Sequence, residues 1–169
     1  QMCIRDRRNE EAIKLLEEAG YSKANPLKFS ILYNTNENHK KVAIAAASMW
    51  KANTKGLIDV KLENQEWKTY IDSRRAGRYD AARAGWNADY NQATTFGNYF
   101  LSNSSNNTAK YANPEYDKAI AESYVATDAE GRAKAYAKAE EILAKDFGIV
   151  PIFNYVNPHL VKPYVKGYS

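Results

Sequence analysis

The chain has 169 residues, 44% of them hydrophobic and 26% charged, and its 24 lysine and arginine residues against 20 acidic ones give a net charge of +4. This length corresponds to one domain or most of one, and the mean hydropathy of −0.65 is too low for a membrane-spanning segment. The basic residues are scattered along the chain instead of forming a patch, which argues against nucleic acid as a partner.

The first seven residues show neither helical nor strand periodicity, and they join abruptly to a clear helical pattern. We therefore expect residues 1–7 to be a non-native leader outside the fold. They contain Cys3, the single cysteine of the chain. A chain without cysteine is compatible with the cytoplasm and with the periplasm, so the compartment stays open at this point.

The next part of the chain alternates between helices and strands. Apolar residues recur at helical spacing up to Ala19, and Gly20 supplies a left-handed cap that ends this first helix. The elements predicted after it are a strand at 27–33, a helix whose apolar stripe is Val42, Ala45, Ala46, Met49 and Trp50, a strand at 57–62, a helix at 65–75 and a strand at 79–86. Successive helix–strand passages predict an α/β fold with a mixed, mainly parallel sheet flanked by helices.

Beyond this layer the character of the sequence changes. Residues 87–112 are rich in Asn, Ser, Thr and aromatic side chains, too polar for a core element, and loops beyond strand ends are where α/β proteins place ligands. The elements predicted after this loop are a helix with Asn113 as N-cap and Tyr116, Ile120 and Tyr124 on one face, a helix from the capping box at 127–130 to about Asp146, and an edge or bulged strand at 148–155 broken by Pro151.

Asp89 is the leading candidate for a ligand contact, because it lies where a predicted strand gives way to this loop. A carboxylate there suits a cationic group, while Arg83 and His39 could hold the opposite charge of the same ligand. A zwitterion such as a peptide fits both requirements, which favours a binding module over an enzyme. Asp89 could instead accept hydrogen bonds within its own turn, and His39 could be a solvated residue near a helix start.

The motifs that would identify an enzyme are missing. His39 and His159 lack metal-ligand spacing, no glycine-rich phosphate loop follows a strand, and no nucleophile elbow is present. A hydrolase that uses Asp89 and Glu66 as a carboxylate pair is a remote alternative. We therefore expect no catalytic residues, no metal and no cofactor.

A family resemblance is carried by four stretches: Asn64 to Thr69, Ala82 to Asn91, Leu101 to Thr108, and Ile149 to Pro163. Together they resemble the C-terminal part of periplasmic oligopeptide-binding proteins, in the peptide and nickel class of solute receptors that serve ABC importers. Such receptors are much longer, so the resemblance implies an incomplete fragment of a type II periplasmic-binding-protein-like fold. Residues 8–157 would be a partial ligand-binding lobe, and residues 158–169 the start of the return segment toward the other lobe.

The resemblance implies a receptor whose two lobes close over an extended oligopeptide and deliver it to the permease subunits of an ABC importer. It implies a monomer in the periplasm with peripheral contact to the membrane complex, the signal peptide lying outside this fragment. A receptor specialised for murein peptides is the nearest alternative.

Individual roles also follow from the resemblance. Asp89 would pair with the peptide α-ammonium, and Arg83 and His39 would meet the carboxylate of shorter peptides. The remaining ligand-binding positions are Trp67, Arg74, Gly85, Trp86, Asn87, Asn106 and Tyr155. Many family members carry a disulfide-bonded cysteine where this chain has Asn87, so that bridge cannot form here, although backbone contacts could persist. Trp67 and Trp86 could also be plain core aromatics.

Overall fold

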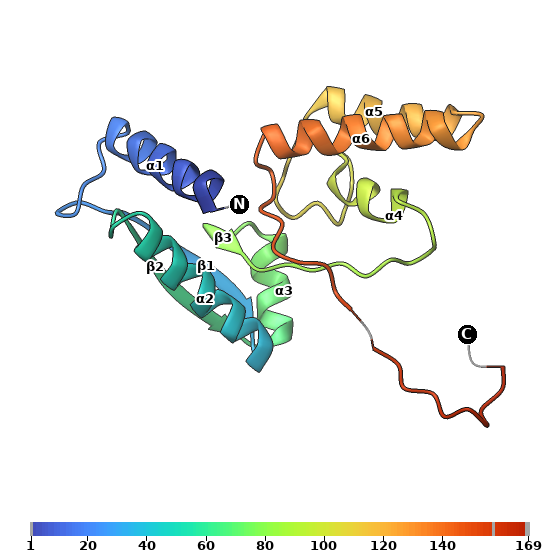
Figure 1. The fold of residues 1–169 in the computed structure, drawn as a ribbon, viewed down its shortest axis with the longest axis horizontal. Helices are drawn as coiled ribbons and strands as arrows, with labels where there is room; N and C mark the ends of the chain where they lie inside the picture. The colour runs from blue at the N-terminus through green and yellow to red at the C-terminus, as the bar shows by residue number, and fades with distance from the viewer. Residues whose placement is uncertain (1, 157, 168–169) are drawn as a thin grey trace. The chain divides into compact units, whose positions relative to one another are not determined.

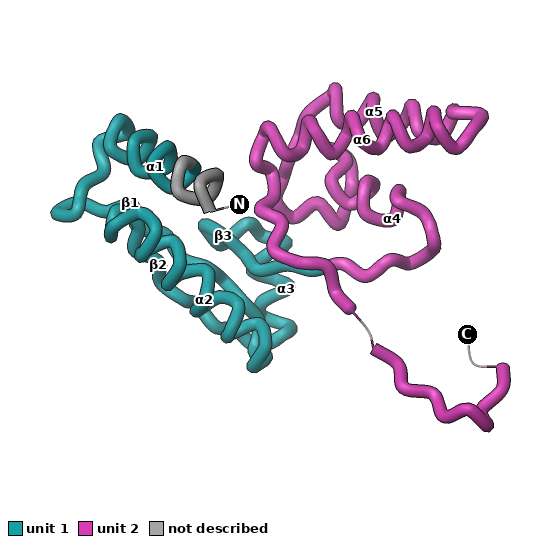
Figure 2. Tube along the Cα trace, in the orientation of Figure 1, with its two compact units in different colours: residues 1–85 teal, residues 86–169 magenta. Residues whose placement is uncertain are grey.

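The structure is a computed structural model that describes residues 2–156 and 158–167, with side chains from Arg8 onward. Figure 1 shows the elements of the chain, and Figure 2 shows its division into two compact units, which we call unit 1 (residues 1–85) and unit 2 (residues 86–169). Each unit has a hydrophobic core cluster of its own. Residue 157, the predicted end of the lobe, lies outside the described residues.

Unit 1 is built on a three-stranded sheet with the order β2-β1-β3. Its strands are β1 (Leu27–Asn34), β2 (Ile58–Gln65) and β3 (Ala81–Ala82). Both pairings are parallel, with Leu27 opposite Ile58 and Ile31 opposite Ala81. The predicted parallel sheet is confirmed.

The strand predicted at 79–86 is much shorter in the structure. At its start, the backbone N–H and the hydroxyl of Ser30 both donate to the Asp80 carboxylate, at 2.8 and 3.0 Å, so a side chain takes the place of a backbone partner. At its end, the Arg83 carbonyl accepts a hydrogen bond from the Tyr70 hydroxyl. Side-chain hydrogen bonds at both ends thus limit the ladder to Ala81 and Ala82.

Three long helices belong to unit 1: α1 (Met2–Glu18), α2 (Glu37–Asn53) and α3 (Trp67–Arg75). α1 runs back to Met2 although residues 1–7 lack helical periodicity, and the expectation that these residues are a non-native leader stays a prediction. Gly20 has a φ of 88° and ends the segment as predicted.

One face of α2 packs on the sheet. Ala43 is buried against Ile31 and Tyr33, and the Trp50 ring lies 5.8 Å from that of Phe29. Ala45 and Met49 are exposed, so the buried stripe is rotated by about one residue from the predicted one. Because the segment is apolar on several faces, the sequence did not determine which face of α2 is buried.

Unit 2 is helical in its described part. Its elements are α4 (Thr94–Gly97), the 3₁₀ turn η1 (Asn98–Phe100), α5 (Pro114–Val125) and α6 (Ala129–Lys145). α5 and α6 form a hairpin, seen in Figure 1, whose core is Tyr116, Ala119, Ile120, Ala139 and Leu143. Tyr124 is 60% exposed and exchanges hydrogen bonds with Asn98, so it does not share the buried face as predicted.

The helix caps of unit 2 follow from short polar side chains. Asn113 accepts from the N–H groups of Glu115 and Tyr116, which confirms it as the N-cap of α5. α6 is capped by Asp128, which accepts from the Gly131 N–H at 2.6 Å, one residue later than the predicted box at 127–130.

Residues 148–155 form no strand, which corrects the prediction. Every strand in the described part of the chain belongs to unit 1, so within unit 2 this segment has no neighbour to form a ladder with. An apolar run with strand composition still needs a paired backbone to become a strand.

The loop at 87–112 is more closely packed than its polarity suggested. Thr94, Thr95 and Asn107 are buried. Asn107 donates to the carbonyls of Leu101 and Tyr111 at 3.1 and 2.7 Å and accepts from the Tyr111 N–H. Hydrogen-bonded polar side chains therefore fill the positions that apolar ones take elsewhere. Among the helices that the structure describes, none is long and apolar enough to cross a membrane.

Candidate functional site

The predicted site residues fall into both units. Unit 1 contains His39, Trp67, Arg74, Arg83 and Gly85, and unit 2 contains Trp86, Asn87, Asp89, Asn106 and Tyr155. Each group is gathered by the elements of its own unit.

His39 and Arg83 meet at the carboxyl edge of the unit 1 sheet. His39 lies in the first turn of α2, directly after β1, and Arg83 directly follows β3. The His39 Nδ1 atom lies 2.8 Å from the Oδ1 atom of Asn34, the last residue of β1. Because parallel strands end at one edge, residues far apart in sequence come together where α/β proteins bind ligands.

The electrostatics of this edge favour an anion. The pKa of His39 lies below its usual value of 6.5, first because the ring is partly desolvated and second because Arg83 places a positive charge nearby. An approaching carboxylate would be attracted to Arg83, and it would also favour the protonated form of His39. The pair predicted to meet a ligand carboxylate is thus brought together.

Two further candidate residues, Trp67 and Arg74, lie on α3 close to the Tyr70 ring. Tyr70 is 1% exposed, and its hydroxyl donates to the backbone carbonyl of Arg83. The Trp67 ring lies 5.8 Å from the Tyr70 ring, and the Arg74 guanidinium lies 5.4 Å from the centre of the same ring. Trp67 is 62% exposed, so it is not the plain core aromatic of the alternative interpretation.

Asp89 forms a reciprocal pair with Thr95 in unit 2. The Asp89 backbone N–H donates to Thr95 Oγ1 at 3.0 Å, and the Thr95 hydroxyl donates to Asp89 Oδ2 at 3.2 Å. The side chain is exposed, and within the described part of unit 2 no lysine, arginine or histidine forms an ion pair with it. Asp89 thus accepts a hydrogen bond from a side chain of its own loop, as the alternative interpretation of a turn residue expected.

The other unit 2 candidates lie in irregular backbone. The Trp86 ring packs edge-on against Tyr99 at 5.0 Å, and its buried Nε1 atom has no hydrogen-bond partner among the described residues. Asn87 is exposed, as is Gly85 at the end of unit 1.

Asn106 and Tyr155 are also exposed. The Asn106 N–H donates to Ser104 Oγ at 3.3 Å, and its carbonyl accepts from the Thr108 N–H at 2.8 Å. The Tyr155 ring lies 5.5 Å from that of Phe153. The ligand roles of all these residues stay predictions.

Four residues that organise the site were not found from the sequence: Asn34, Tyr70, Thr95 and Asn107. Each acts through side-chain hydrogen bonds that the apolar pattern of the sequence does not indicate. Only the Thr94-Thr95 pair at the start of a helical turn carried a local signal, since hydroxyl side chains favour such positions.

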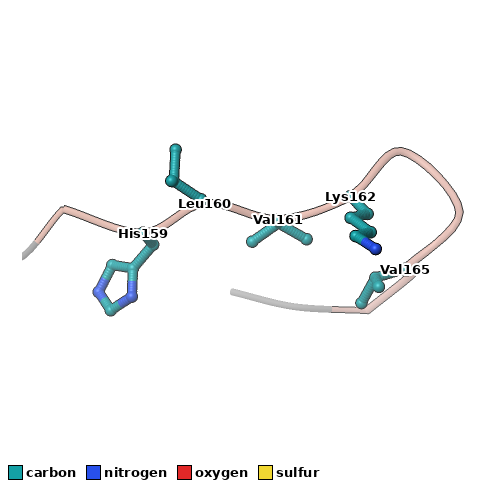
Figure 3. A pocket seen from close by; sticks show the side chains of 5 residues that line it. All are labelled: His159, Leu160, Val161, Lys162 and Val165. Carbon is teal, nitrogen blue, oxygen red and sulfur yellow. The ribbon is translucent and has the colours of Figure 1, made fainter.

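Two shallow hollows in the described part of the chain contain none of the predicted residues. One, of about 300 Å³, is lined by His159, Leu160, Val161, Lys162 and Val165, which Figure 3 shows along a single bend of the chain. The other, of about 360 Å³, lies on the sheet surface around Lys28, Lys61 and Asp80. Among the described residues, no three His, Cys, Asp or Glu side chains gather as metal ligands would.

Comparison with known proteins gives a family. The family model described as bacterial extracellular solute-binding proteins, family 5 Middle, matches residues 5–108, which is more than half of the chain.

Individual relatives agree with this match. The chain is 96% identical over 162 residues to the periplasmic oligopeptide-binding protein OppA of Haemophilus influenzae, which covers 96% of the chain and 30% of that relative. It is 49% identical over 160 residues to the periplasmic murein peptide-binding protein MppA of Escherichia coli K12, covering 95% of the chain and 29% of MppA.

Solved structures have the same fold. The crystal structure of Haemophilus influenzae OppA in complex with RPPGFSPFR superposes with a TM-score of 0.89 at 94% identity, covering 97% of this chain and 32% of that one. Unliganded, open MppA gives a TM-score of 0.87 at 48% identity, covering 96% of this chain and 31% of that one. The predicted α/β solute-receptor fold is confirmed, and the chain spans about 30% of the length of its relatives. It belongs to the family 5 bacterial extracellular solute-binding proteins.

Proposed function

We propose that this chain is part of the peptide-binding lobe of a periplasmic oligopeptide receptor that supplies an ABC importer. The observation that carries the proposal is the 96% identity with Haemophilus influenzae OppA, together with the peptide RPPGFSPFR in the complex of the solved relative. Such high identity over this length argues that the chain serves the same class of ligand as that relative.

The distribution of charge supports a zwitterionic ligand. Asp89 is an exposed carboxylate without an ion-pair partner in the described part of unit 2, and it suits a peptide α-ammonium. His39 and Arg83 suit a peptide carboxylate. A desolvated ammonium–carboxylate pair is a charge-assisted hydrogen bond, and truncation of one partner typically costs about 2–5 kcal/mol of binding.

An open strand edge supports capture of a peptide main chain. β3 is an edge strand of the β2-β1-β3 sheet, and the backbone beyond it, from Arg83 through Asp89, forms no helix or strand. An extended peptide can add to such an edge through backbone hydrogen bonds that do not depend on its side chains. This mode allows one receptor to accept peptides of many sequences.

Calorimetric titration of a full-length receptor containing this chain with tri-lysine tests the proposal. We expect saturable binding of one peptide per receptor. No detectable binding of tri-lysine or of RPPGFSPFR would refute it.

The murein-peptide alternative rests on the likeness to MppA, which at 49% identity is much weaker than the likeness to OppA. Competition between tri-lysine and a murein tripeptide distinguishes the two. We expect tri-lysine to displace the murein tripeptide at comparable or lower concentration. Retention of the murein tripeptide against a large excess of tri-lysine would reverse the assignment.

OppA and MppA are binding proteins by name, and we propose that this chain is likewise not an enzyme. Glu66 accepts a hydrogen bond from the Thr35 hydroxyl at 2.9 Å, which is a structural contact. Bound tri-lysine should be recovered intact after prolonged incubation. Its conversion to shorter peptides would revive the hydrolase alternative.

The receptor is expected to be a periplasmic monomer that meets the permease subunits only at the membrane surface. Because the chain spans about 30% of its relatives, we expect residues 1–169 alone to bind tri-lysine more weakly than about millimolar, since one wall of the cleft and the closing motion would be absent. Size-exclusion chromatography with light scattering and titration of the 169-residue chain test these two expectations.

A further inference from the structure

The most specific contact of the candidate site is the reciprocal pair between Asp89 and Thr95. Thr95 Oγ1 accepts from the Asp89 backbone N–H at 3.0 Å, and the same hydroxyl donates to Asp89 Oδ2 at 3.2 Å. A hydroxyl has one proton to donate, so this arrangement commits that proton to the carboxylate. Oδ1 accepts no hydrogen bond from the described residues of unit 2 and stays available.

Thr95 itself is firmly placed. It is 5% exposed, and its backbone N–H donates to the Gln92 carbonyl at 3.2 Å. Two residues later, the Gly97 carbonyl accepts from the Tyr116 hydroxyl at 2.8 Å, which joins α4 to α5. Asp89 lies on an exposed loop, but its carboxylate is held by a buried hydroxyl whose helix is anchored to the core of unit 2.

We propose that Thr95 is a positioning residue for peptide recognition, which orients the Asp89 carboxylate so that its free oxygen receives the peptide α-ammonium. This role rests on the proposed peptide-binding function. Thr95 does not touch the peptide; it acts through Asp89.

The physical basis is preorganisation. An exposed aspartate samples several side-chain rotamers, and a ligand that needs one of them must restrict the others on binding. The Thr95 hydroxyl restricts them in advance and also satisfies the Asp89 N–H. Loss of this hydroxyl should weaken binding of a free α-ammonium by about tenfold, the size of one hydrogen bond together with the ordering of one side chain. A peptide whose amino group is acetylated gains nothing from an oriented carboxylate and should be unaffected.

Thr94 offers a matched control. It is the neighbouring threonine in α4 and 2% exposed, and its Oγ1 atom accepts from the Tyr90 hydroxyl at 3.1 Å and lies 3.4 Å from Gln92 Oε1. Thr94→Val removes the same group from an equally buried position that has no contact with Asp89. Thr95→Ser keeps the hydroxyl and loses only the methyl group, so it serves as the rescue variant.

The experiment measures the Kd of a full-length receptor containing this chain for tri-lysine and for N-acetyl-tri-lysine. We expect Thr95→Val to bind tri-lysine about tenfold more weakly and N-acetyl-tri-lysine unchanged, whereas Thr95→Ser and Thr94→Val behave like the parent. In an Asp89→Asn background, Thr95→Val should cause no further loss, because the group that it positions is gone.

Each other outcome overturns the role. Equal loss for both peptides would make Thr95 merely structural, and no loss for tri-lysine would make it dispensable. If Thr95→Val does not fold, Thr95→Ala removes the same hydroxyl. Its effect is judged in the same way, by comparing the change in Kd for tri-lysine with the change in Kd for N-acetyl-tri-lysine. Failure of the parent to bind either peptide would instead refute the proposed function, and equal binding of both by the parent would refute the Asp89 anchor on which this role depends.

Discussion

α4 approaches α5 closely at Gly97, and an added methyl group there should destabilise unit 2. A Cβ atom on Gly97 would lie 2.7 Å from Ile120 Cδ1, 3.7 Å from Ile120 Cγ1 and 3.9 Å from the Tyr116 hydroxyl. The first distance is too short, and Ile120 is buried in the core cluster, so its side chain cannot simply swing into solvent.

The net effect follows from two opposing terms. Overpacking of a filled core costs about 1–3 kcal/mol. Replacement of glycine by alanine in a helix recovers about 0.5–1 kcal/mol. We therefore expect Gly97→Ala to lower the free energy of unfolding by about 1 kcal/mol, within a range of about 0–2.5 kcal/mol.

A double-mutant cycle isolates the contact. Ile120→Val removes Cδ1, the atom at 2.7 Å, and by itself should cost about 0.5–1.5 kcal/mol. In Gly97→Ala/Ile120→Val the obstructing atom is absent, so the double variant should be no less stable than Ile120→Val alone. Urea unfolding of the chain, followed by circular dichroism with an unchanged slope, measures all four free energies. If the losses of unfolding free energy caused by Gly97→Ala and Ile120→Val are strictly additive in the double variant, the proposed clash between the two residues is wrong.

Two further predictions concern pH. His39 is held neutral by a lowered pKa, chiefly through desolvation and then through Arg83, so binding of a peptide carboxylate beside it should take up a proton and strengthen as the pH falls from about 8 to 6. Titration in two buffers of different ionisation enthalpy measures the uptake; identical binding enthalpies would contradict it. The pKa of Asp146 is lowered by hydrogen bonds from Tyr111 and then Asn113, so its contribution to stability is present above the ordinary carboxyl pKa and is lost as the pH falls through the lowered value. We expect Asp146→Asn to flatten the acid decline of the unfolding free energy between about pH 5 and 3, and an unchanged slope would contradict this.

Sequence periodicity predicted the regular elements well where they bury one face. β1, β2, α2, α5 and α6 were found in order, and Asn113 was identified as a cap because its amide faces free N–H groups. The phase of α2 was not predictable, since its alanine-rich centre is apolar on more than one side.

The sequence did not predict the extent of strands whose pairing depends on residues distant along the chain. The strand at 79–86 is shortened by hydrogen bonds from Ser30 and Tyr70, both far from it along the chain. The strand expected at 148–155 has the right composition but no neighbouring backbone in unit 2. Neither condition leaves a local signal.

The charged residues of the candidate site could be chosen from the sequence, but the hydrogen bonds that hold them could not. Asp89, Arg83 and His39 could be chosen from charge and from family resemblance, and the meeting of His39 with Arg83 follows from parallel strands that end at one edge. The contact between Asp89 and Thr95 joins an irregular loop to the first turn of α4, six residues later, and it matches neither the helical nor the strand period. Only the folded loop shows that the carboxylate is held.

The most direct test of the account is the Kd of a full-length receptor containing this chain for tri-lysine and for N-acetyl-tri-lysine, measured with Asp89 intact and with Asp89→Asn. We expect acetylation and Asp89→Asn each to weaken binding by about 2–5 kcal/mol, and we expect the two losses not to be additive, because both remove the same ammonium–carboxylate pair. Equal affinity for the two peptides, or an Asp89→Asn receptor that still distinguishes them, would contradict it.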